Sequence, residues 1–161
     1  MLLDSCDGAG WPRLMEELRP AATFVFLGGA FLYGKAFDGR WRHACYPAWD
    51  QMFESNLSRR LGDVANGNGR VAPIWVMTVP YPLGPYDSAR VRAEVDCINA
   101  SIRRACATAA GVRLLDFADL LCPAGRCPQE REGTALRPDG VHFDVEAARS
   151  VARELLAQVG R

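Results

Sequence analysis

The stretch "ATFVFLGG", residues 22–29, is a continuous apolar run that ends in two glycines. Strands of a parallel sheet are covered by helices on both faces, so they are apolar at nearly every position. This run therefore predicts a strand buried in a parallel sheet. The same pattern recurs in "APIWVMTVPYP" (72–82), and "VRLLDFADLL" (112–121) is predicted as a third strand that runs into a loop.

Helical patterns separate these strands along the chain. They cover residues 11–20, 46–69, 86–111 and 144–158. Strands that alternate with helices predict right-handed βαβ units, with helices on both faces of a parallel sheet. We therefore expect an α/β fold, a three-layer α/β/α sandwich, in a single domain that spans residues 1–161.

Charge and hydropathy exclude several classes of partner. Nineteen basic residues balance nineteen acidic ones, so no overall field favours nucleic acid. No apolar run reaches the ~18 residues that a membrane-spanning helix needs. The first eleven residues, "MLLDSCDGAGW", have no basic region and only a short apolar run, so they do not resemble a signal peptide.

The six cysteines fit no zinc-binding spacing. Cys122 and Cys127 flank "PAGR", and such a tight loop either closes as a disulfide or holds two unpaired small side chains. Cys97 and Cys106 lie on a predicted helix, where packing is the better interpretation. Cys6 and Cys45 have no interpretation from the sequence alone.

Three segments follow the carboxyl ends of the predicted strands, at one edge of the sheet. In open α/β sheets, ligands bind outside this edge. They are Gly28-Gly29, "TVPYP" (78–82), and the loop from Asp116 to His142.

Within that loop, the spacing of Asp139 and His142 has a chemical logic. A carboxylate three residues earlier can orient the imidazole through Nδ1 and leave Nε2 for a nucleophile. The alternative is an aspartate that caps the last helix and a surface histidine.

The segment "RPDGVHFDVEAARSVARELL" (137–156) resembles the C-terminal block of the SGNH (GDSL) hydrolase superfamily, in which the catalytic Asp and His occur as D-x-x-H before the last helix. "LRPAATFVFLGGAFLYGKAFDGRW" (18–41), "PIWVMTVPYP" (73–82) and "LLDFADLLCPAGRC" (114–127) extend the similarity to the SGNH domains of bacterial membrane O-acyltransferases. The resemblance implies a flavodoxin-like sheet, a base at His142 and an orienting carboxylate at Asp139.

Family members also carry further strands and a G-D-S nucleophile block before the part matched here. We therefore expect a partial domain whose N-terminal strands are largely missing. Ser5, in "LLDSCDGAG", follows an aspartate as the family's nucleophile does, but the leading glycine is absent. Either Ser5 is the nucleophile or it lies in a loop before the helix at 11.

The family's oxyanion donor corresponds to the backbone amide of Gly29, and no asparagine follows it. Tyr81, between two prolines at a strand's carboxyl end, is the candidate substrate-binding aromatic residue. The resemblance implies an ester substrate, with an acetyl or short acyl group on a sugar or similar acceptor. It implies neither a metal nor an organic cofactor.

A second hypothesis is a non-catalytic or split module that keeps the scaffold without the nucleophile block. For the isolated chain we expect weak or no turnover of short-chain aryl esters. We also expect weak stability, or self-association through the exposed sheet edge at 22–28. The resembled domains lie outside the cytoplasm, but this sequence itself leaves the localisation unknown.

Overall fold

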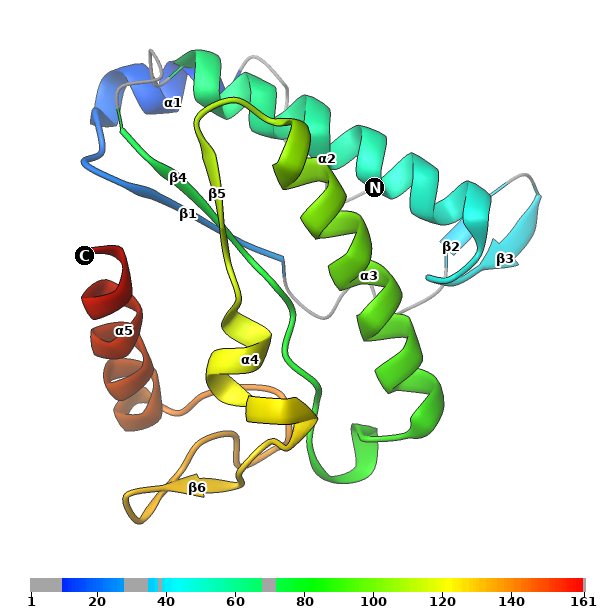
Figure 1. Ribbon diagram of the computed structural model, residues 1–161, viewed down its shortest axis with the longest axis vertical. Coiled ribbons are helices and arrows are strands. Elements are labelled where there is room, and N and C mark those ends of the chain that lie inside the picture. Colours follow the sequence, from blue (N-terminus) through cyan, green and yellow to red (C-terminus); the bar gives the residue numbers. More distant parts are fainter. Residues whose placement is uncertain (1–9, 28–34, 38, 68–71, 161) are drawn as a thin grey trace.

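The computed structural model describes residues 10–27, 35–37, 39–67 and 72–160 (Figure 1). Its helices are α1 (Gly10–Leu18), α2 (Pro47–Gly67), α3 (Ala89–Thr108), α4 (Phe117–Leu121) and α5 (Val145–Val159), with short 3-10 helices at Gly84–Tyr86 (η2) and Pro123–Gly125 (η3). Its strands are β1 (Thr23–Phe26), β2 (Lys35–Phe37), β3 (Arg40–Arg42), β4 (Ile74–Met77), β5 (Val112–Leu115), β6 (Glu130–Arg131) and β7 (Thr134–Ala135).

A three-stranded parallel sheet in the order β1-β4-β5 forms the centre of the fold. Thr23 of β1 pairs with Ile74 of β4, which in turn pairs with Val112 of β5. The predicted mixed α/β chain with a parallel sheet is therefore confirmed. Among the described strands none pairs with the outer edge of β1. The predicted burial of this strand is therefore wrong, because Phe24 and Phe26 are exposed at the sheet edge. Self-association through this edge stays a prediction.

The two faces of β4 pack against different helices. Ile74 and Val76 belong to a core that they share with α2 and α3. Met77 belongs to a second core, with Ala147 and Val151 of α5, and Trp75 packs against that core. Figure 1 likewise shows α5 across the strands from α2 and α3. Because successive side chains of a strand point to opposite faces, a run that is apolar throughout serves both cores.

The larger core is built mainly by α2 and α3. Both helices turn an apolar stripe inwards, and their fully buried side chains include Trp49, Leu61, Ile98 and Ile102. Ser88 caps α3, because its hydroxyl accepts the backbone N–H of Val91.

The third apolar run departs from its prediction. β5 ends at Leu115, and residues 117–121 form helix α4 instead of continuing as strand or loop. The Asp116 side chain accepts the N–H of Asp119 and so caps this helix. The polar loop that follows contains the two-residue strands β6 and β7, which pair with each other.

Two disulfides link cysteines of the described residues. Cys122–Cys127 confirms the bridge that the sequence left open, with 3.9 Å between the Cα atoms. Cys45–Cys97 is the second, and it corrects the interpretation of Cys97 as a packing residue. Cys106 is buried with a free thiol, and Cys6 lies outside the described residues.

No helix in the described part of the chain combines the length and the apolar character that crossing a membrane requires.

Candidate functional site

The turn at residues 139–142 holds the two predicted site residues in contact. His142 Nδ1 lies 2.6 Å from Asp139 Oδ2. Asp139 Oδ1 also accepts the backbone N–H groups of Val141, at 2.8 Å, and His142, at 2.7 Å. Three hydrogen bonds thus fix one carboxylate against one imidazole, in the contact that the D-x-x-H spacing predicts.

Gly140 docks this turn onto the segment that follows β4. Its φ is +86°, a conformation that favours glycine. Its carbonyl accepts the N–H of Leu83 at 2.8 Å. A Cβ atom at this position would lie 2.3 Å from the Leu83 carbonyl oxygen, so only glycine allows so close an approach. The turn is therefore held next to the segment that leaves the carboxyl end of β4.

The pKa of Asp139 lies well below its ordinary value. The hydrogen bond to the His142 side chain contributes most to this lowering, and the two backbone N–H bonds add to it. Asp139 is consequently a carboxylate at neutral pH, and a carboxylate can only accept hydrogen bonds. The neutral imidazole must therefore carry its proton on Nδ1. Nε2 has no hydrogen-bond partner among the described residues, and the His142 side chain is 81% exposed.

A cavity of about 730 Å³ lies beside this histidine. Its wall is mostly apolar, with Phe26, Tyr86 and Phe143 as its aromatic members. Its charged or titratable members are Arg90, Glu94, Arg137 and His142. A largely apolar pocket with a few convergent polar groups is the usual form of a small-molecule site.

Buried polar contacts shape the wall that follows β4. Asn99 of α3 is buried, accepts the N–H of Val79 at 2.7 Å and donates to its carbonyl at 2.9 Å. One residue earlier, the Thr78 hydroxyl donates to Asp116 Oδ1 at 2.9 Å and accepts the N–H of Ala118. These contacts fix the path of the chain into Pro80 and Pro82, which line the cavity.

Tyr81 lies differently from what its position suggests. Its hydroxyl donates to Asp96 of α3 at 2.5 Å, and this bond is the main cause that raises the pKa of the phenol. Tyr81 is not among the described lining residues, whereas the prolines on either side of it are. Its role in substrate binding stays a prediction.

Ser5 and Gly29, the predicted nucleophile and oxyanion donor, lie outside the described residues. The structure does place Ser88 in the cavity wall, a position that the sequence pattern does not single out. Arg137 was also missed, because an arginine in a polar loop is ordinarily a solvated side chain.

The other histidine has long-range partners that no short spacing indicates. Nη2 of Arg90 lies 3.2 Å from His43 Nδ1, and Glu94 Oε1 lies 3.8 Å from the same atom. His43 thus contacts a charged pair on α3, and Asp139 is not one of its described partners.

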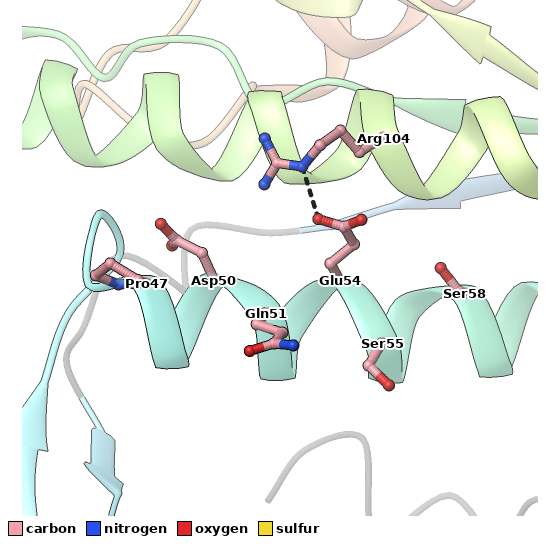
Figure 2. Close-up of a pocket in the computed structure, with 7 residues that line it drawn as sticks. All are labelled: Pro47, Asp50, Gln51, Glu54, Ser55, Ser58 and Arg104. Carbon is pink, nitrogen blue, oxygen red and sulfur yellow. Dashed lines mark hydrogen bonds and ion pairs between the residues drawn. The ribbon is translucent and has the colours of Figure 1, made fainter.

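A second, open cavity of about 460 Å³ lies between α2 and α3 (Figure 2). Arg104 reaches across it to Glu54 at 2.7 Å. Asp50 accepts the N–H of Cys45, and burial raises the pKa of this carboxyl. Since its acidic groups already have partners, this groove offers less chemistry than the cavity at His142.

The described residues contain no group of three or more potential metal ligands. Comparison of the chain with protein-family models finds no match, and comparison with curated protein sequences also finds none.

Proposed function

We propose that the chain is an SGNH-type ester hydrolase or O-acyltransferase domain, with His142 as the general base and Asp139 as the residue that orients it. The contact of 2.6 Å between Nδ1 and Asp139 is the observation that carries this proposal. It leaves Nε2 unpaired in the wall of a cavity large enough for a small ester.

In this mechanism, Nε2 accepts the proton of a serine hydroxyl as the serine oxygen attacks the ester carbonyl. The resulting imidazolium returns the proton to the departing alcohol, which leaves an acyl-enzyme. Water or an acceptor alcohol then attacks the acyl carbon as the same base takes its proton, and the imidazolium returns that proton to the departing serine oxygen. The Asp139 carboxylate stabilises the imidazolium in both steps.

Two serines are candidates for the nucleophile. The family resemblance favours Ser5, with the Gly29 amide as oxyanion donor. Ser88 is the serine among the described lining residues, although its oxygen also caps α3. Labelling of the nucleophile distinguishes the two.

The parallel sheet and the arrangement of the helices support a flavodoxin-like, three-layer domain as in SGNH hydrolases. An acyl group on a sugar or similar acceptor is the substrate that this family implies. Two disulfides are typical of proteins that work in oxidising compartments, which favours a place outside the cytoplasm.

The competing proposal is a binding module without catalysis. It is favoured by the absence of any described hydroxyl within hydrogen-bond reach of His142 Nε2. Such a module would bind its ligand in the same cavity and form no covalent intermediate.

A fluorophosphonate probe separates the two proposals, because it phosphonylates a serine only where a base activates the hydroxyl. We expect one serine to be labelled, at a site located by peptide mass spectrometry. His142→Ala should slow labelling about 100-fold or more. The control His43→Ala removes the other histidine and should label at the wild-type rate.

Labelling of Ser5 or Ser88 identifies the nucleophile. If the folded wild-type chain is not labelled, or if His142→Ala labels equally fast, the ester chemistry is wrong and the binding module is favoured.

A further inference from the structure

Arg137 begins the turn that carries the pair Asp139 and His142, called the dyad below. Its carbonyl accepts the N–H of Gly140 at 2.8 Å. Its side chain runs inwards, and only 5% of the residue is exposed. Nη1 donates to the carbonyl of Tyr81 at 2.6 Å, and Nη2 lies 3.8 Å from the disulfide sulfur of Cys122.

This guanidinium has no counter-ion among the described residues. Its hydrogen-bond partners among those residues are a carbonyl and a disulfide sulfur, not a carboxylate, and its buried Nε has no partner there. Burial lowers its pKa from the ordinary value, yet an arginine stays protonated in proteins. A buried charge without a partner is costly, so proteins usually pair it.

The other charged residues of the cavity do not neutralise the positive charge of Arg137. Arg90 and Glu94 both line the cavity and form an ion pair at 2.9 Å. Without counting His142, two arginines and one glutamate give the lining a net charge of 2 − 1 = +1. Asp139 contacts His142 but is not part of the described lining.

We infer that the cavity takes an ester that also carries an anionic oxygen group, a carboxylate or a phosphate, with Arg137 as its counter-ion. Both groups accept hydrogen bonds from a guanidinium, which binds them more strongly than it binds neutral acceptors. The inference rests on the proposed ester chemistry of His142, and it narrows the substrate class to acidic esters.

A purely structural Arg137 would only hold the Tyr81 carbonyl in place. That role predicts no preference between an anion and a neutral molecule of the same shape. Selectivity for charge is therefore the property to measure, and stability alone would not distinguish the two roles.

The test is the equilibrium binding of benzoate, phenyl phosphate and neutral benzamide at low salt, followed by NMR. The aromatic ring of these probes suits the wall formed by Phe26, Tyr86 and Phe143. We expect the wild type to prefer one or both anions over benzamide about ten-fold or more. Arg137→Gln should remove this preference, and Arg137→Lys should retain part of it.

Arg59→Gln is the matched control, since Arg59 is an exposed residue of α2 that donates a hydrogen bond to Asn56 and does not line the cavity as described. It should keep the wild-type preference. Equal binding of anion and amide by the wild type, or a preference that survives in Arg137→Gln, overturns the inference. If both Arg137 variants unfold, the Nε–H resonance of Arg137 in the wild type decides: it must shift when benzoate binds, and no shift overturns the inference.

These measurements need no turnover, so they separate two failures. A preference for the anion without serine labelling overturns the ester chemistry and leaves the anion site. Serine labelling without that preference overturns the anion site alone.

Discussion

At the scale of single residues, Gly140 decides whether the dyad reaches the cavity. Its positive φ and its close approach to the Leu83 carbonyl both require the absence of a side chain. The turn that it allows presents Asp139 Oδ1 to two backbone N–H groups. A single glycine thus couples the orienting carboxylate to the segment after β4.

We predict that Gly140→Ala lowers the free energy of unfolding by about 2 kcal/mol or more, because a left-handed conformation and a backbone clash add together. Gly84→Ala is the matched control: φ is +60° there, but no atom lies within 4 Å of the added Cβ. That variant should lose only about 1 kcal/mol, the cost of the conformation. Urea unfolding measures both, and equal losses would show that the contact with Leu83 is unimportant.

At the scale of elements, the exit of β4 is held by α3. Asn99 satisfies both backbone polar groups of Val79, as a neighbouring strand would. The chain can therefore leave the sheet at Val79 with both backbone polar groups of that residue paired, and it continues into the cavity wall.

We predict that Asn99→Leu costs about 2–5 kcal/mol of the free energy of unfolding, because it leaves a buried N–H and a buried carbonyl unpaired. Asn56→Leu serves as the control on α2, where the amide oxygen accepts a hydrogen bond from the exposed Arg59, and it should change stability by less than about 0.5 kcal/mol. Denaturant unfolding followed by circular dichroism gives both values. Near-identical values for the two variants would contradict this account of the strand exit.

The sequence predicts the elements that depend on local pattern. The apolar runs of β1 and β4 and the helical periods of α2, α3 and α5 all mark real elements. Residues 117–121 form a helix that the sequence did not predict, because a short apolar run fits a strand as well as a helix. The cap at Asp116 favours the helix.

The features of the candidate site likewise fall into those that a local sequence pattern predicts and those that it does not. The contact between Asp139 and His142 follows from a three-residue spacing, so the sequence predicts it. The burial of Arg137 and the Cys45–Cys97 bond depend on segments that meet only in the folded chain, and no local pattern indicates them.

At the scale of the whole molecule, the two disulfides stabilise the fold unequally. Cys45 and Cys97 are separated by 52 positions, whereas Cys122 and Cys127 are separated by five. A crosslink that closes a longer loop removes more entropy from the unfolded chain.

We predict that replacing Cys45 and Cys97 together by serine costs about 4 kcal/mol, against about 2 kcal/mol for Cys122 and Cys127. Thermal unfolding of the two double variants measures the difference, and the reverse order would contradict it. Cys106 should resist alkylation in both folded variants, because burial raises the pKa of its thiol to about 11.

The central claim is that Asp139 holds His142 as a base with Nε2 free, and the imidazole tautomer tests it most directly. The chain has two histidines, so long-range ¹H–¹⁵N NMR resolves each ring, and His43→Gln assigns them. At a pH high enough that the ¹⁵N shifts of both rings no longer change, we predict a proton on Nδ1 of His142. In Asp139→Asn the Nε2–H form should gain population. A wild-type His142 with its proton on Nε2 would contradict the account.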